Sequence, residues 1–464
     1  MYEISIDNQV ADLATGQSLE LKRFNPIFDL STIRGGLIND FTLPFTRVND
    51  KIFGWAREAQ VPLVKSQFYC EQKADGLVVE KGTLELVDIA EDGYVVAFTS
   101  NYSEFFGRYH NTLLNKIDFG SEAVPAAPVK AADHINDSYC WPTVANADFY
   151  GTNTQAGWNG YMNQWDGTTL NAHARVPMLF MRWVWEQLAT LCEFSFEGAF
   201  FESDVYKRGV FFNTFSIDDR STITYQNHLP ELTVVGLVLE LKKLFGLRVG
   251  LDVKKRIVRL DFIQPYFEKG AEANYTTKIK PVNARSPEQV TRLKLDWQVD
   301  GNDGTMKVLP ADMEAYESAG TTQPLEITSA FSTCITDGGV AKVEMEGNTG
   351  RFGQGEKSFA PRLLLWNGDG VALRTYGSWN LAWSGANNIH EKCWGNYEAW
   401  RSNTSKKVVP AVLNAVDLIN TSWHENTGAV DVVYSKGKEY YVAEVSVILP
   451  LEGVAELVLW ERNL

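Results

Sequence analysis

The clearest pattern in the chain is a helical spacing that changes into a strand spacing between Leu229 and Phe262. The second spacing is an alternation of apolar and polar residues, interrupted by the basic run Lys254–Arg256, which indicates a turn. Thr233 and Gly246 suit the two ends of a helix. The segment therefore predicts a helix that leads into a β-hairpin packed back on it. The apolar face of that helix, which is expected to be buried, carries Val234, Leu237, Val238, Leu241, Leu244 and Phe245.

A similar unit precedes this one by 53 positions. In Val176–Phe201, apolar residues at helical spacing are followed by Phe194 and Phe196, which alternate with polar residues. Aligned without a gap, Pro177 corresponds to Pro230 and Leu188 to Leu241. An internal duplication gives this correspondence, and so do any two amphipathic helices that are followed by strands. Both interpretations stay open at this point.

Residues 1–115 carry the pattern of a compact N-terminal β domain, with one short helix expected at Ile52–Gln60. Two hairpin turns, Ala74-Asp75-Gly76 and Glu91-Asp92-Gly93, end in a glycine, which is expected to supply the positive φ of a tight turn. The strands that these turns join are Val64–Glu71 with Gly76–Val79, and Leu84–Ile89 with Tyr94–Thr99.

Three further segments complete the predicted organisation. Residues 116–175 are an aromatic and glycine-rich insertion with a long ordered loop, 176–270 hold the two helix–strand units, and 271–464 are a C-terminal β-rich domain. In the last segment a helix is expected within Lys407–Ile419, after Pro410. The predicted fold class is α+β and β-rich. The strands expected in the last segment are Val290–Val299, Val340–Glu346, Pro361–Trp366, Val430–Tyr434, Tyr440–Leu449 and Val454–Trp460.

Composition narrows the function classes. A chain of 464 residues has room for two to four domains, and its net charge of −15 argues against a nonspecific nucleic-acid binder or a protein bound to anionic lipid. Five widely spaced cysteines without a CxxC pair predict reduced, mostly buried thiols. The first residues, MYEISIDNQVADL, have no apolar core of a secretory signal, and no apolar run is long enough to span a membrane.

Aromatic residues form 12% of the chain, and many of its 14 tryptophans fall in Phe149–Trp165 and Trp366–Trp400. Such segments suit β-structure, large interfaces and sugar-binding platforms alike, so this composition alone does not choose between them.

Few motifs suggest chemistry. Gly350–Ser358 resembles a phosphate-binding P-loop, but Glu356 stands where the lysine should follow the second glycine, and its carboxylate would repel phosphate. His390 and Cys393 have metal-ligand spacing without a second pair, and His134 and Cys140 are isolated. We therefore expect no catalytic, cofactor-binding or metal site, and a protein that is not an enzyme.

Two stretches carry a resemblance to a known family. Leu43–Gly54, which reads LPFTRVNDKIFG, and the helix–hairpin HLPELTVVGLVLELKKLFGLRVGLD resemble tail hub proteins of tailed phages, which are similar to hubs of contractile injection systems. The start of the chain and Val176–Gly198 also look like this family. The resemblance covers residues 1–115 and 176–265, and only loosely the C-terminal part. The aromatic-rich segments 116–175 and 366–400 are not explained by it.

The resemblance implies a structural virion protein made in the host cytoplasm. Its tube-forming, β-barrel-like domains would build a trimeric ring between tail tube and spike, beside tube, tape-measure and spike proteins, with DNA passing through the lumen without specific binding. A receptor- or carbohydrate-binding tail protein is the alternative. A glycoside hydrolase that uses two carboxylates is a third interpretation.

Overall fold

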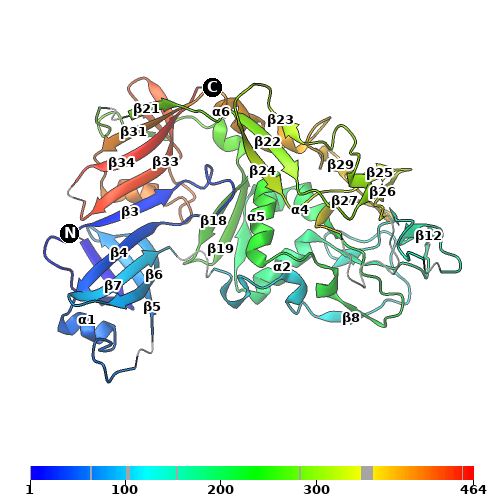
Figure 1. The fold of residues 1–464 in the computed structure, drawn as a ribbon, viewed down its shortest axis with the longest axis horizontal. Helices are drawn as coiled ribbons and strands as arrows, with labels where there is room; N and C mark the ends of the chain where they lie inside the picture. Colours follow the sequence, from blue (N-terminus) through cyan, green and yellow to red (C-terminus); the bar gives the residue numbers. More distant parts are fainter. Residues whose placement is uncertain are drawn as a thin grey trace.

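The computed structural model describes residues 2–62, 65–100, 105–152, 155–281, 284–345, 359–451 and 453–463. In these residues the chain forms two parts that lie side by side (Figure 1). The sheet lobe, at the left in blue and red, is built mainly from the two ends of the chain. The central body, at the right, is built mainly from the middle. Each part encloses its own cluster of buried apolar side chains.

One 13-stranded sheet organises the sheet lobe, and strands from the two chain ends are neighbours in it. β3 (Leu19–Phe24) pairs antiparallel with β33 (Lys438–Leu449), so that Leu19 lies opposite Leu449. This pairing joins an N-terminal half of the sheet to a C-terminal half. The N-terminal half runs β2 (Gln9–Val10), β1 (Tyr2–Ile6), β5 (Gln67–Ala74), β6 (Leu77–Ile89), β7 (Gly93–Thr99), β4 (Leu37–Pro44), β3. The C-terminal half continues β33, β34 (Ala455–Glu461), β31 (Ser405–Ala411), β21 (Ala284–Pro287), with β32 (Val432–Ser435) and β20 (Ala273–Asn274) as a branch.

The path of this sheet is open in the described residues. It ends at β2 on one side and at β21 on the other, and these two strands do not pair with each other. The predicted β-rich α+β class is confirmed. A closed barrel, which the expected barrel-like domains would favour, is not formed by the strands that the structure describes.

The hairpin turns of the N-terminal half use their glycines in two different ways. Between β5 and β6, Asp75 and Gly76 both have positive φ, as expected for a tight turn. Gly93, at the start of β7, is not in that conformation, so this expectation was wrong. Its hydrogen is required for another reason: a Cβ there would lie 2.2 Å from the carbonyl oxygen of Leu43 in β4.

The helix expected at Ile52–Gln60 is wrong. α1 spans Arg47–Ile52 and begins where the Thr46 hydroxyl accepts a hydrogen bond from the backbone N–H of Asn49. It ends before Gly54 and Trp55, which both have a φ of 62° and cannot continue a right-handed helix.

The helix expected within Lys407–Ile419 is also wrong over its first half. β31 includes Pro410, and its buried residues alternate, so the strand period holds through the proline. Pro410 lacks an N–H, but its carbonyl oxygen accepts a hydrogen bond from Lys280. α7 (Ala415–Asn420) follows, after a capping box in which Asn414 and Asp417 bond to each other's backbone N–H groups.

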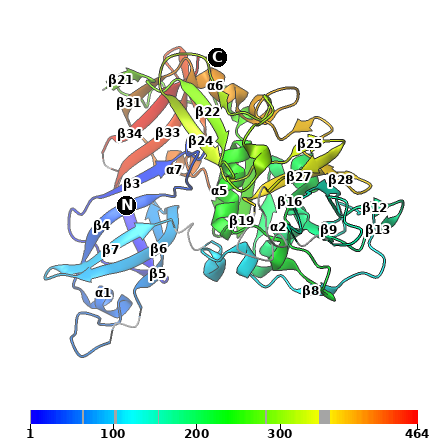
Figure 2. The same cartoon turned by 45° about the vertical axis from the view of Figure 1, so that its right-hand side comes forward.

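The helix–hairpin predicted from Leu229–Phe262 is confirmed. α5 spans Val234–Phe245, the Thr233 hydroxyl accepts from the Gly236 N–H, and Gly246 is left-handed at φ 54°. β18 (Leu247–Asp252) and β19 (Ile257–Phe262) form the antiparallel hairpin. The hairpin lies on the side of the body that faces the sheet lobe in both views (Figures 1 and 2).

The first helix–strand unit shares a sheet with the second. α2 spans Met181–Leu191, and β15 (Ser195–Glu197) pairs in parallel with β19, giving the order β15-β19-β18. The two units therefore form one packed structure, in which both predicted apolar stripes contribute to the body's core.

The rest of the central body consists of short helices and strands that pack around these units. Asp148–Thr169, predicted as a long ordered loop, contains only two-residue strands in its described residues. No helix within the described ranges is long and apolar enough to cross a membrane. The remaining helices are α3 (Ala199–Glu202), α4 (Asp204–Arg208) and α6 (Gly395–Arg401). The remaining strands are β8 (Ser121–Ala123), β9 (Tyr139–Cys140), β10 (Val144–Ala145), β11 (Tyr161–Met162), β12 (Trp165–Asp166), β13 (Thr169–Leu170), β14 (Met178–Leu179), β16 (Gly209–Phe212), β17 (Thr222–Thr224), β22 (Arg292–Trp297), β23 (Tyr316–Glu317), β24 (Pro324–Ser329), β25 (Ile335–Asp337), β26 (Val340–Lys342), β27 (Arg362–Gly368), β28 (Val371–Leu373), β29 (Thr375–Tyr376) and β30 (Trp379–Asn380).

Candidate functional site

A buried ion pair ties together three segments of the sheet lobe. Arg23 of β3 donates from Nε to Oε2 of Glu80 in β6 at 2.8 Å, and both side chains are almost fully buried. The same guanidinium donates to the carbonyl oxygens of Val79 and of Leu418 in α7. Ser100 donates to the other Glu80 oxygen at 2.7 Å. Because each partner is buried, removing either one would leave an uncompensated charge.

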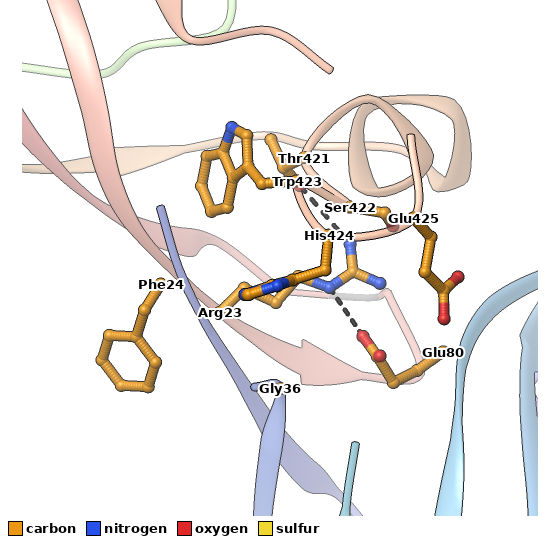
Figure 3. Close-up of a pocket in the computed structure, with 9 residues that line it drawn as sticks. All are labelled: Arg23, Phe24, Gly36, Glu80, Thr421, Ser422, Trp423, His424 and Glu425. Atoms are coloured by element: carbon orange, nitrogen blue, oxygen red, sulfur yellow. Dashed lines mark hydrogen bonds and ion pairs between the residues drawn. The ribbon is translucent and has the colours of Figure 1, made fainter. Parts of the chain in front are cut away.

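This ion pair lines a small cavity, shown in Figure 3, which we call the junction pocket. The loop after α7 closes it with Thr421, His424 and Glu425. Gly36 lies at its edge, where a Cβ would come within 2.8 Å of the Ser100 hydroxyl oxygen. The cavity measures about 20 Å³, which is room for about one water molecule.

The two titratable side chains of the loop have shifted pKa values. Burial, together with the negative charges of Glu80 and Asp252, raises the pKa of Glu425 to about 7. Burial lowers the pKa of His424 to about 3, and its neutral ring donates from Nε2 to the Arg34 carbonyl oxygen at 3.0 Å. The pocket thus holds a carboxyl group that changes its charge near neutral pH.

The chemistry open to the junction pocket is limited by its size and by its hydrogen bonds. A general acid beside an ionised carboxylate is the pairing that glycoside hydrolases use. Here Glu80 is already bonded to Arg23 and Ser100, and the cavity has no room for a sugar. The geometry instead suits a contact that holds β3, β6 and the α7 loop together.

A second buried ion pair connects the sheet lobe with the helix–hairpin. Arg248 of β18 lies 3.2 Å from Asp431, and it also donates to the Trp423 carbonyl oxygen. Asn25 donates to the other Asp431 oxygen at 3.0 Å. Residues from the N-terminal segment, the central hairpin and the C-terminal segment therefore meet at Asp431, which is fully buried.

His390 and Cys393 lie in one π-helix, His390–Trp394, but their side chains have different surroundings. His390 Nε2 lies 2.5 Å from Glu398 Oε2, and its ring stacks on Tyr316 at 3.7 Å between centroids. The Glu398 carboxylate also accepts from the Tyr316 hydroxyl, so this cluster fastens β23 to α6. Cys393 is buried, and burial raises the pKa of its thiol. Within the described ranges, no group of three metal-ligating side chains was found.

The other residues considered as metal ligands or as a phosphate-binding loop lie in different parts of the structure. The backbone carbonyl of His134 accepts from Arg182, and Cys140 Sγ bonds to the Met178 carbonyl oxygen. The P-loop-like stretch Gly350–Ser358 lies outside the described residues. All five cysteines are free and buried, as predicted.

Most of the tryptophans in the second aromatic segment support the chain's own core. Trp366, Trp383, Trp394 and Trp400 are each at most 1% exposed. The first segment also contributes, since Phe149 and Tyr150 are buried against Trp158. At these positions the aromatic side chains therefore pack within the chain's own core.

The junction residues were not identified as a site from the sequence, although one signal was present. Leu19, Leu21 and Arg23 occupy alternate positions of β3 that all face the core. A charged residue in such a position requires a buried partner. The sequence gives no indication that this partner is Glu80, because β6 lies far along the chain.

No protein-family model matches the chain, and no curated protein sequence does. The solved structures that align with the chain include three tail proteins. The 43 kDa tail protein of prophage MuSo2 from Shewanella oneidensis has a TM-score of 0.40 at 10% identity, over 99% of this chain and 97% of that chain. The tail protein from Neisseria meningitidis MC58 has a TM-score of 0.37 at 10% identity, over 99% and 96%. Prophage tail protein gp18 from Listeria monocytogenes EGD-e has a TM-score of 0.37 at 9% identity, over 100% and 94%.

Proposed function

We propose that the chain is a structural subunit of a phage tail, and that it acts as the hub. In this proposal three copies form a ring between the tail tube and the spike. The stretches that resemble tail hub proteins form well-defined elements here. Leu43–Gly54 spans the end of β4 and α1 with its Thr46 cap, and the helix–hairpin is α5 with β18 and β19.

The observation that carries the proposal is the open sheet made from both ends of the chain. Every residue of its two terminal strands, β2 and β21, is exposed. Exposed sheet edges pair readily with other chains unless they are blocked. A ring requires contacts between two different surfaces of neighbouring subunits. The β2 edge of one subunit and the β21 edge of the next meet this requirement.

The face of the sheet opposite its core supports a role as the wall of a conduit. Its lysines pair with acidic neighbours: Lys73 with Glu3 at 3.1 Å and Lys81 with Glu71 at 2.6 Å. Pairing neutralises the positive charges that would otherwise attract DNA phosphates. We expect this face to line the lumen, so that DNA passes without specific binding.

The alternative of a receptor- or carbohydrate-binding tail protein loses its main support from composition. It rested on aromatic residues in loop-like segments, and most of the tryptophans in Trp366–Trp400 are buried. We also propose that the protein is not an enzyme and requires no cofactor. Supporting this, the raised pKa of Glu425 occurs in a pocket of about 20 Å³.

Disulfide crosslinking in assembled tails tests the ring. We would combine Val10→Cys in β2 with Ala284→Cys in β21, because the five native cysteines are buried and will not compete. The double variant should give covalent trimers on oxidation, and each single variant should not. The control pairs Val10→Cys with Val308→Cys, because Val308 is 85% exposed and belongs to neither edge strand. Crosslinking that is equal in the control, or absent from tails that contain the double variant, would contradict edge pairing.

A further inference from the structure

A large cleft lies in the central body, away from the junction pocket. It measures about 580 Å³, within the range of small-molecule sites in proteins. Five segments surround it: residues 115–116, 212–215, 227–231, 298–302 and 359–361. These segments lie at or directly beside the ends of two 3-10 helices, η3 (Leu114–Lys116) and η4 (Tyr225–His228), and of three strands, β16, β22 and β27, so the cleft is built on the ends of regular elements. We call it the amide cleft.

Carboxamide side chains dominate the polar lining of the amide cleft. Asn227 and Gln298 line it from two different segments, and neither side chain has a hydrogen-bond partner within the part of the chain that the structure describes. Each amide offers both donors and an acceptor. Two such groups can bond to hydroxyl groups of a ligand, which also donate and accept.

Asn213 makes the adjoining wall rigid. Its Nδ2 donates to the Pro177 carbonyl oxygen at 2.9 Å, and its Oδ1 accepts from the Phe215 N–H and lies 3.1 Å from His228 Nδ1. The His228 ring is fully buried, and burial lowers its pKa to about 3. A fixed, uncharged wall therefore stands behind the free amides.

Charge in the amide cleft is nearly balanced. Asp300 is bonded to Arg362 at 2.8 Å, and Glu231 accepts from Asn115. Lys116 is the cation that lines the cleft among the described residues. Ligands with phosphate groups normally require several cations or a bidentate arginine. The lining therefore favours a neutral ligand.

Apolar groups supply the remaining surface. Phe215 is partly exposed and its ring is held by Arg220 at 4.6 Å, and Val299 is 68% exposed. Pro230 and Pro361 add two rigid rings to the lining. Small apolar faces between polar groups suit a ligand that itself alternates C–H surfaces with hydroxyl groups.

We propose that the amide cleft binds a neutral oligosaccharide. Asn227 and Gln298 bond to its hydroxyl groups, and Phe215 and Val299 contact its C–H faces. This site does not depend on the sheet edges, so the proposal stands or falls independently of the hub function.

Glycan-array screening of the full chain, followed by calorimetric titration, tests the proposal. The array should include neutral glucose and N-acetylglucosamine oligomers, sialylated and phosphorylated glycans, and unmodified peptides. Neutral glycans should bind, and the variant Asn227→Ala/Gln298→Ala should bind the best of them at least tenfold more weakly. Val299→Trp, which fills the cleft from an exposed position, should abolish binding. Val308→Trp is the matched control, since Val308 is exposed outside the cleft, and it should bind like the parent.

Melting temperatures would be measured for every variant, and Val299→Trp remains informative if the double variant is unstable. Failure of every neutral glycan to bind the parent would overturn the proposal. Equal binding by parent and Val299→Trp would place any glycan site elsewhere and overturn it too. Selective capture of charged glycans, or of peptides alone, would show that the cleft has a different ligand class.

Discussion

Glu193 and Gly246, 53 positions apart, have the same left-handed φ of 54°: Glu193 comes two residues after the end of α2, and Gly246 directly follows the end of α5. Left-handed backbone is ordinary for glycine and strained for glutamate. The two helix–strand units thus each have a left-handed residue after the helix, although only one has the residue that suits it. Because many helices end with a left-handed residue, duplication and chance similarity both account for this shared φ.

Substitutions at Glu193 and Gly246 should change the stability of the protein in opposite directions. Glu193→Gly should stabilise the protein by about 0.5–1 kcal/mol, since it relieves left-handed strain at an exposed position. Gly246→Ala should destabilise it by more than about 1 kcal/mol, because a Cβ there would also lie 2.8 Å from the Cys393 carbonyl oxygen. Urea unfolding measures both changes. Destabilisation by Glu193→Gly would contradict the strain at that position.

Substitution of Leu241 tests whether the apolar stripe of α5 belongs to the core of the central body. The side chain is fully buried, as its place on the apolar stripe predicted. Leu241→Asp should lower the free energy of unfolding by more than about 4 kcal/mol, since it removes core contacts and buries a charge. Val416→Asp on α7, where the parent side chain is 54% exposed, is the control and should change little. Equal melting temperatures for Leu241→Asp and the parent would show that the stripe is not core.

Glu425 should make stability depend on pH. Its pKa of about 7 lies above the value of 4.5 for a free glutamate, so the folded state holds a proton that the unfolded state has lost. The stability that this proton provides is fully present below pH 4.5 and is lost as pH rises to about 7. Because Glu425 is partly exposed, the free energy of unfolding should fall by only about 1–2 kcal/mol over this range. The charged and titratable groups around Glu425 are Arg23, Glu80, Lys81, Asp252 and His424.

Glu425→Gln removes this titration. The variant should melt above the parent at pH 8 and together with it at pH 4, as measured by differential scanning calorimetry. Glu122→Gln is the comparison at a partly buried carboxylate outside the junction pocket, which accepts hydrogen bonds from Tyr139 and Tyr225. A constant difference between Glu425→Gln and the parent at all pH values would exclude proton release at Glu425.

Lys242 of α5 is a buried cation, although it does not belong to the predicted apolar face of the helix. Burial lowers its pKa to about 8, and Nζ donates to the Thr32 carbonyl oxygen at 2.9 Å. The folded state thus holds this proton less tightly than the unfolded state, and stability from this group rises between pH 8 and pH 10.5. Lys242→Met should gain about 1 kcal/mol at pH 7, after the lost hydrogen bond is counted, and less at pH 10. A gain in unfolding free energy that does not change with pH would contradict this cause.

Local structure was predictable where one segment contains all of its own signals. Thr233, the apolar stripe and Gly246 define α5 without help from elsewhere. The helix predicted at Ile52–Gln60 does not form, because the N-terminal cap at Thr46 starts the helix earlier and the left-handed residues Gly54 and Trp55 end it. The helix predicted within Lys407–Ile419 is wrong over its first half, because pairing with β34 holds the chain in a strand across Pro410.

The junction pocket could not be predicted from the sequence, for a different reason. Arg23 in a core-facing strand position predicts a buried partner. Glu80 reaches it only through the pairing of β3 with β4, β4 with β7 and β7 with β6, and Leu418 comes from the C-terminal segment. No spacing rule connects residues that lie so far apart. The aromatic segments left their use open, because their composition is the same whether the rings face solvent or, as Trp366 and Trp400 do, the core.

Cryo-electron microscopy of the intact tail tests the central claim most directly. The account predicts three copies of this chain around the tail axis, with β2 of each subunit beside β21 of the next and the paired-charge face of the sheet toward the lumen. Copies bound at the periphery of the tail, away from its axis, would contradict the hub and favour a receptor-binding role.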